Sequence, residues 1–314
     1  MLSRIAESLF WIGRYVERAD GTSRLLDVHL QLLLEDPWVE ENQACRSLLE
    51  VIGSSAEQAG ISPSHNLGRA ELLEILSVDR NDPSSIASSL NSARENARRV
   101  REIVSTELWE CLNTTRSRMP RKVALDRAHD FFAWVRERTA LAIGIVESST
   151  SRDEAWTFFT LGRSLERVDM TARLLATSEL TEASGPSWTT ILRSCGAYEA
   201  YLRTYRGVPS ATNAAEFLLL DRIFPRSVIF AITRAENCLA DLAPSTDRVG
   251  VSDAALRQLG QIRTNLEYRS APEILANLTS EMVSLQQGIS EISESIRSRY
   301  FPVNAAPVWV GEVL

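Results

Sequence analysis

Arginine and glutamate recur in one pattern at two places in this chain of 314 residues. The segment FWIGRYVERADGTSRLL covers residues 10–26, and FTLGRSLERVDMTARLL covers residues 159–175 with ten of seventeen positions identical. Guanidinium groups bind carboxylates and phosphates through paired hydrogen bonds, while carboxylates orient the guanidinium groups or bind amines. The shared charges are therefore candidates for substrate binding or for an ion-pair network. These candidates are Arg14, Glu17, Arg18, Asp20, Arg24, Arg163, Glu166, Arg167, Asp169 and Arg173.

A helix must position these charges, and the pattern predicts that it has neighbours on two sides. At about 100° per residue, the apolar residues Ile12 and Val16 belong to one stripe, and the charges lie opposite that stripe. Phe10 and Leu25 fall inside the charged arc, so the charged side also contacts something apolar. Charged residues on a solvent-exposed helix face can usually be replaced by other polar residues. Both segments nevertheless keep the same charged residues, which indicates that these charges are constrained. We infer either buried ion pairs or a ligand site, and the sequence leaves both open.

A second, weaker echo follows the first in the same order. EILSVDRNDPSSI at 74–86 matches EFLLLDRIFPRSV at 216–228. Two echoes in register predict an internal duplication. We therefore expect an all-α helical bundle of two duplicated halves related by pseudo-two-fold symmetry. The expected units are a first half at 1–149, a second half at 150–300 that shares one core with the first, and an extended C-terminal tail at 301–314.

One long helix is predicted over 83–112, with Asp82 as its N-cap and Pro83 at its first position, and Pro225 is predicted to start a helix in the second half. The helix over 83–112 carries a second polar series, which is either an exposed, salt-bridged face or an anion-binding stripe. The members of this series are Arg94, Glu95, Asn96 and Arg101.

Composition excludes several classes of function. The chain has 34 basic and 41 acidic residues, a formal net charge of −7, which disfavours nucleic acid and anionic membrane as partners. No run of 18 apolar residues predicts a membrane span. Four cysteines without a CxxC pair predict buried free thiols in a reducing, cytoplasmic compartment. Nucleotide, hydrolase and zinc motifs are absent from the sequence, so we expect no cofactor and no metal.

The motifs GRYVERADGTSRLL and GRSLERVDMTARLL, with DPSSI, ARENARRVRE and LWECLN between them, resemble the alpha-E family of bacterial helical proteins. The similarity runs from Met1 to about Tyr300. It implies association with circularly permuted ATP-grasp enzymes and with transglutaminase-like and proteasome-like peptidases. The implied role is ATP-dependent amide-bond formation that makes or attaches a small peptide. The family pattern transfers to Glu17, Arg18, Glu166, Arg167, Arg94, Glu95, Asn96 and Arg101, without a proven catalytic residue.

Three hypotheses follow. The leading one is an accessory or substrate-handling component of an ATP-grasp amide ligase system that binds an acidic or amino-acid-like substrate. The second is a non-catalytic helical scaffold whose Glu/Arg network only holds the fold. The third is a free-standing enzyme that uses Glu17 and Glu166 as acid and base. Whether the chain is an enzyme stays open at this point.

Overall fold

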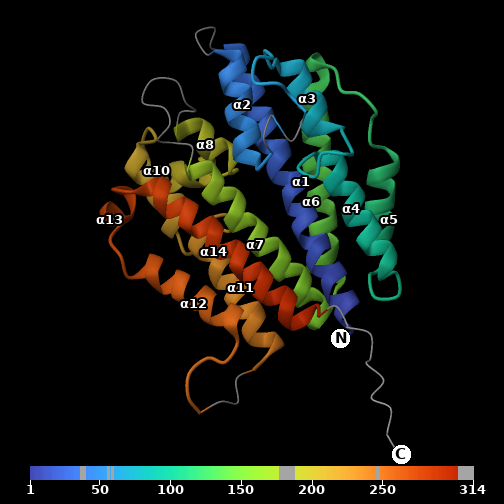
Figure 1. Cartoon of the computed structure of the whole chain (residues 1–314), viewed down its shortest axis with the longest axis vertical. Helices are drawn as coiled ribbons and strands as arrows, with labels where there is room; N and C mark the ends of the chain where they lie inside the picture. The colour runs from blue at the N-terminus through green and yellow to red at the C-terminus, as the bar shows by residue number, and fades with distance from the viewer. Residues whose placement is uncertain (36–39, 55–56, 58–59, 177–187, 245–247, 303–314) are drawn as a thin grey trace, which may run out of the picture.

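The computed structural model describes residues 1–35, 40–54, 57, 60–176, 188–244 and 248–302. Within these ranges every regular element is a helix, and helices make up 75% of the chain (Figure 1). The all-α class predicted from the sequence is confirmed.

Two long helices, α1 (Ser3–Glu35) and α7 (Glu154–Ala176), form the centre of the bundle. They carry the two repeated segments and run side by side in the same direction (Figure 1). Gly13 and Gly162 lie at the contact. A methyl group on Gly13 would lie well under 3.0 Å from the carbonyl oxygen of Phe159, and one on Gly162 equally close to that of Phe10. The two backbones therefore touch, because neither glycine has a side chain to separate them.

Three helices of the first half cover α1. Both α4 (Ile86–Arg99) and α6 (Ala128–Ser149) pack on α1, and α5 (Thr106–Ser117) packs on α4 and α6.

The second half covers α7 with a similar set. Both α11 (Val228–Leu242) and α14 (Leu278–Tyr300) pack on α7, and α12 (Ala254–Glu267) packs on α11 and α14. The shorter elements are α2 (Glu41–Ile52), α3 (Arg69–Ser77), η1 (Leu125–Arg127), α8 (Trp188–Ser194), α9 (Tyr198–Tyr205), α10 (Ala211–Leu220) and α13 (Ala271–Leu275).

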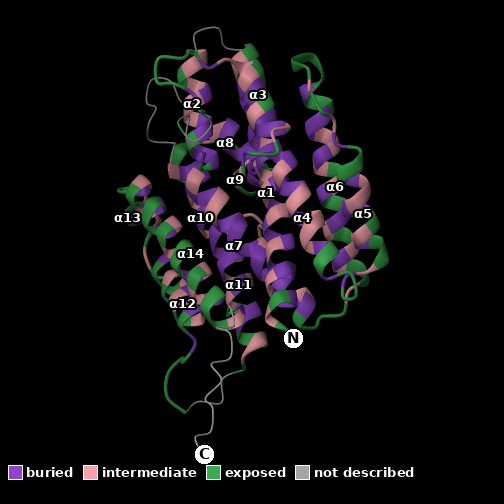
Figure 2. Ribbon diagram, turned by 45° about the vertical axis from the view of Figure 1, so that its right-hand side comes forward, coloured by how far each residue is buried: buried purple, intermediate pink, exposed green. Residues whose placement is uncertain are grey.

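Buried apolar side chains form one cluster through both sets of helices. Figure 2 shows α1 and α7 as the most continuously buried ribbons. Phe10 and Leu25, the apolar residues inside the charged arc, are 2% and 3% exposed. The prediction that the repeated helix has neighbours on two sides is confirmed.

The helix predicted over 83–112 is two helices, so its predicted continuity is wrong. Val100 ends α4 with φ of −122° and ψ of 34°, outside the helical region. Ser105 then starts α5, because its Oγ accepts a hydrogen bond from the backbone N–H of Leu108 at 3.1 Å. A serine oxygen at this position satisfies an N–H that has no partner inside the helix.

The predicted helix starts at Pro83 and Pro225 are also wrong. Each helix begins three residues later, with Ser85 and Ser227 as the N-caps. Each serine Oγ accepts a hydrogen bond from the backbone N–H three residues on, at 3.0 and 3.2 Å. Asp82, the predicted N-cap, instead accepts from the backbone N–H two residues on, at 2.7 Å, and so stabilises the preceding turn.

The predicted tail at 301–314 falls outside the described residues from 303 onward. At its start, Phe301 is buried against the rings of Phe10 and Phe158, with centroids 5.6 and 5.8 Å away. The end of α14 is thereby tied to both central helices.

The four cysteines are buried free thiols, as predicted. Burial raises the pKa of Cys45, Cys195 and Cys238 to about 12, so these thiols are protonated and unreactive at neutral pH. Among the described helices, none has the length and apolarity needed to cross a bilayer.

Candidate functional site

The first glutamate of the repeat is held by the opposite helix. Glu17 on α1 accepts hydrogen bonds from Arg167 on α7, through Nε at 2.8 Å and Nη2 at 2.7 Å. Arg163 adds a third contact through Nε at 3.3 Å. The Glu17 side chain is 2% exposed, so this group is sealed inside the bundle.

The second glutamate is held in the reverse direction. Glu166 on α7 accepts from Arg14 Nε at 2.8 Å and from Arg18, whose Nε and Nη2 grip both carboxylate oxygens as a fork. Arg14 also donates to Ser293 Oγ on α14 at 3.0 Å. Each glutamate is thus bound by two arginines of the other helix, and the ion pairs cross the contact where the backbones touch.

The remaining charges of the repeat pair along their own helices. Arg24 Nε donates to Asp20 at 2.9 Å, and Arg173 Nε donates to Asp169 at 2.7 Å. Both pairs have the i, i+4 spacing that places side chains on one face of a helix. All ten predicted residues therefore lie in one ion-pair region of α1 and α7.

One member of this region was not predicted. Arg226, which precedes the N-cap of α11, donates to Glu17 Oε1 at 3.0 Å and also binds Asp20. Its side chain is 19% exposed. No counterpart marks it in the sequence, because the residue aligned with it in the second echo is Ser84.

The network keeps Glu17 and Glu166 ionised. Burial alone would raise the pKa of Glu17, but the charges of Arg167 and Arg226 lower it well below the usual range. For Glu166, burial is likewise outweighed by its two arginines, and the pKa is lowered. A carboxylate with such a low pKa is a poor proton acceptor at neutral pH. The arrangement therefore disfavours the hypothesis that Glu17 and Glu166 act as acid and base.

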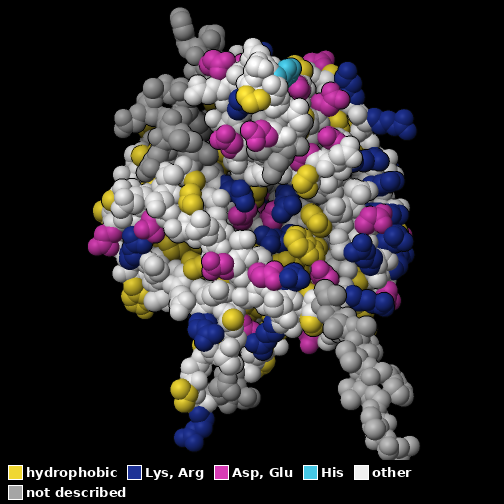
Figure 3. Space-filling model, viewed as in Figure 1, with side chains coloured by type: hydrophobic (Ala, Val, Ile, Leu, Met, Phe, Trp, Pro, Cys, Tyr) yellow, Lys and Arg dark blue, Asp and Glu magenta, His cyan; other side chains and the backbone are white. Residues whose placement is uncertain are grey.

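A groove of about 650 Å³ opens beside one side of the network, between α1, α7 and α14. Arg14, Arg18, Asp169 and Arg173 line it, and Trp11 adds an aromatic wall. In Figure 3, basic, acidic and apolar side chains gather in the middle of the face shown, over these helices. The volume lies within the range of small-molecule sites.

The Glu17 side of the network has no comparable opening among the cavities described. The pocket next to Glu17, Arg167 and Arg226 has a volume of about 30 Å³, space for little more than a water molecule. The ligand-sized space therefore borders the Glu166 side.

A sequence profile of the Alpha-E family, described as a predicted alpha-helical domain with a conserved ER motif, matches residues 1–301. The chain belongs to the Alpha-E family. In this Alpha-E chain, Glu17-Arg18 and Glu166-Arg167 are consecutive Glu-Arg pairs, and all four residues take part in the crossed network.

Curated relatives of this Alpha-E chain come from mycobacteria. An uncharacterized protein of Mycobacterium bovis and one of Mycobacterium tuberculosis are each 26% identical to it over 314 residues. The alignment covers 91% of this chain and 35% of each relative, so the chain spans about a third of the length of the curated relatives it matches. No solved structure matches it.

The second polar series lies apart from the crossed network, on α4 and the segment that follows it. Arg94 and Arg101 lie over the ring of Trp109, each 5.0 Å from its centroid. Glu95 pairs with Arg94, and Asn96 donates to the carbonyl oxygen four residues earlier at 2.8 Å. Of these residues, Asn96 also lines an opening of about 600 Å³ between α1 and α4. The series is held mainly by contacts within the α4–α5 region.

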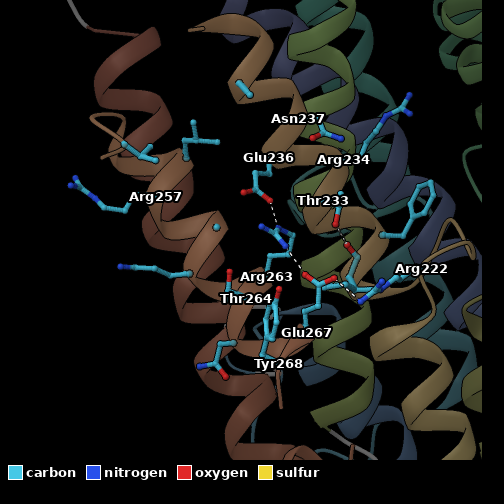
Figure 4. A pocket seen from close by; sticks show the side chains of 18 of the residues that line it. Arg222, Thr233, Arg234, Glu236, Asn237, Arg257, Arg263, Thr264, Glu267 and Tyr268 are labelled. Atoms are coloured by element: carbon cyan, nitrogen blue, oxygen red, sulfur yellow. Dashed lines mark hydrogen bonds and ion pairs between the residues drawn. The ribbon is translucent and has the colours of Figure 1, made fainter. Parts of the chain in front are cut away.

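A wider cleft of about 1080 Å³ is lined by residues of α11 and α12. Figure 4 shows its charged floor as a chain of pairs in which Arg263 contacts Glu236 and Glu267. Glu267 also pairs with Arg222 at 2.7 Å. The charges of Arg222, Glu236, Arg263 and Glu267 thus satisfy one another.

The described residues contain no group of three or more His, Cys, Asp or Glu side chains placed to hold a metal ion. The guanidinium and carboxylate groups that line the groove can recognise a charged ligand.

Proposed function

We propose that this Alpha-E chain binds an acidic or amino-acid-like ligand in the α1/α7/α14 groove. In this role it is a substrate-handling component of an ATP-grasp amide ligase that makes or attaches a small peptide. The groove carries the proposal, because it brings Arg18, Asp169 and Arg173 to one ligand-sized space. The side chains of Arg18 and Arg173 are 25% and 30% exposed, so both can be reached from solvent.

In this proposal the Glu17 side of the network has a structural role, and the Glu166 side binds the ligand. Glu17 and Arg167 are buried, Arg163 is partly buried, and together they join the two helices. Glu166 accepts hydrogen bonds from Arg18 Nε and Nη2, which orients the guanidinium group. Among the described residues Nη1 of Arg18 has no hydrogen-bond partner, so it can donate to a ligand carboxylate. A fork fixed in this way loses little side-chain entropy when a ligand binds.

The partner in this proposal is a circularly permuted ATP-grasp ligase, with a transglutaminase-like peptidase as a further candidate. The alpha-E resemblance supports both. The length of the mycobacterial relatives supports a domain that works next to other domains, because the matched region is about a third of each. Four buried free thiols support a cytoplasmic location.

We also propose that the chain arose by duplication, with halves at 1–149 and 150–300 related by a pseudo-two-fold axis. The crossed glutamates support this, since Glu17 and Glu166 are 149 residues apart and each binds two arginines of the other helix. The N-caps Ser85 and Ser227 support it too, because each also donates its Oγ–H to the carbonyl oxygen six residues earlier.

A scaffold without a ligand is the second candidate. The burial of Glu17 favours it, because a sealed carboxylate bound by three arginines can stabilise the fold without contacting any substrate. The two candidates differ in what they predict for groove residues.

Arg173→Ala and Arg24→Ala form a matched pair of variants that separates the candidates. Each arginine pairs with an aspartate four residues earlier, and their side chains are 30% and 27% exposed. Arg173 lines the groove, whereas Arg24 is absent from its lining. We expect Arg173→Ala to lower ligase product formation about tenfold, the loss expected for one charged hydrogen bond. Arg24→Ala should leave product formation unchanged.

Product is quantified by mass spectrometry after incubating the ATP-grasp partner, ATP and amino acids with each variant. Thermal unfolding of both variants serves as the control for folding. Equal activity of the two variants, with similar losses of thermal stability, would support the scaffold and refute the ligand groove.

A further inference from the structure

Arg226 fills a cation-binding position that two buried carboxylates of the protein form. Its guanidinium group lies between Glu17 and Asp20 and donates to both. With Arg163, Arg167 and Arg24, it makes a cluster of four guanidinium groups around two carboxylates. The pocket described beside this cluster has a volume of only about 30 Å³.

The corresponding carboxylates on the groove side have one guanidinium group fewer. Glu166 and Asp169 follow Glu17 and Asp20 by 149 residues and are bound by three arginines instead of four. Ser84 aligns with Arg226, because Ser84 directly precedes the N-cap Ser85 and Arg226 directly precedes the N-cap Ser227. Within the described ranges, a fourth guanidinium group therefore reaches only the Glu17 and Asp20 pair.

Asp169 corresponds to Asp20 but has no contact that corresponds to the one between Asp20 and Arg226. Arg173 donates to its Oδ2, and within the described part of the chain Oδ1 has no hydrogen-bond partner. The Asp169 side chain is 15% exposed, against 5% for Asp20. Asp20 uses Oδ1 to accept from Thr139 at 3.3 Å. A charged oxygen that borders a ligand-sized groove therefore has room for another donor.

We propose that Asp169 binds a guanidinium or primary ammonium group of the ligand, in the place that corresponds to Arg226 on the other side. This inference rests on the proposed function and narrows its ligand to one that carries such a cation. The neighbouring arginines do not prevent binding, because the Glu17 side holds four guanidinium groups around two carboxylates.

The rest of the groove is compatible with a cationic ligand. Glu7 and Glu291 line it and make no ion pair within the described ranges. Trp11 offers an aromatic face, which attracts cations and covers aliphatic carbons. An amino acid with a basic side chain could place its cation on Asp169 and its carboxylate on Arg18. L-Arginine and its decarboxylated analogue agmatine are therefore suitable probes.

Isothermal titration calorimetry on the full chain tests this inference with three probes: L-arginine, agmatine and glutarate. We expect L-arginine and agmatine to bind, and glutarate, which carries only carboxylates, to bind at least tenfold more weakly than L-arginine. Asp169→Asn keeps the shape of the side chain and should weaken agmatine binding about tenfold or more. Asp130→Asn is the control, since this exposed aspartate pairs only with Arg127 in the described structure. The Asp130→Asn variant should bind agmatine with the same affinity as the wild type.

The outcomes separate this inference from the function on which it rests. If glutarate binds as tightly as L-arginine, and Asp169→Asn leaves agmatine binding unchanged, the cation site is refuted while an anion-binding groove survives. If none of the three probes binds, the cation site is refuted. The proposed function then fails separately if Arg173→Ala retains full product formation.

Discussion

Gly162→Ala is expected to lower the free energy of unfolding by about 3 kcal/mol, the upper part of the range for overpacking a core. The added methyl group would lie well under 3.0 Å from the carbonyl oxygen of Phe10. This neighbour is backbone, which cannot rotate away as a side chain can. The helices α1 and α7 must therefore move apart, and the crossed ion pairs that span them must lengthen.

Urea unfolding followed by circular dichroism measures this loss, with Gly144→Ala as the control. Gly144 lies in helix α6, and a methyl group there would meet nothing within 4 Å. Alanine is the better helix former, so this control should gain about 0.5–1 kcal/mol. A Gly162→Ala protein as stable as the wild type would contradict the close contact of α1 and α7.

Glu17→Gln should cost about 3–5 kcal/mol of folding free energy, the range measured when one partner of a buried ion pair is removed. The variant leaves Arg163, Arg167 and Arg226 without their shared carboxylate, and these three side chains are at most 19% exposed. Glu294→Gln is the control. Glu294 pairs with Arg297 at the surface, where solvent screens the ion pair and the loss of stability should be far smaller than for Glu17→Gln.

The same variant should change the response to acid. The pKa of Glu17 is lower in the folded chain than in the unfolded chain, where it is about 4.3. Its contribution to stability is therefore complete above that value and is lost as the pH falls below it. Urea unfolding between pH 7 and pH 3 should show a smaller loss for Glu17→Gln than for the wild type. Equal slopes, or a cost below about 1 kcal/mol at pH 7, would contradict a buried network.

The repeat in the sequence predicted the centre of this fold well, because its signal is local. Spacing places charges on one helix face, and two apolar residues inside that face, Phe10 and Leu25, indicate a second neighbour. Both are buried. The break between α4 and α5 was missed, since Ser105 reads as an N-cap only once the preceding turn leaves the helical conformation.

The groove could not be predicted from the repeat, because it arises where the residues around the two repeated segments differ. Arg226 fills one carboxylate site, whereas the aligned Ser84 is too short to do so. Glu147 of α6 forms an ion pair with Arg163. The shorter Ser293 of α14 accepts a hydrogen bond from Arg14. These are contacts between distant parts of the chain, and side-chain length there decides whether space remains.

The most direct test of the proposed function is to assay the circularly permuted ATP-grasp ligase that we propose as partner for an ATP-dependent amide product by mass spectrometry. The partner is incubated with candidate amino acids, including arginine, with and without this chain. We expect a product that forms only, or at least tenfold faster, when the chain is present. The same product at the same rate in its absence would contradict a substrate-handling role.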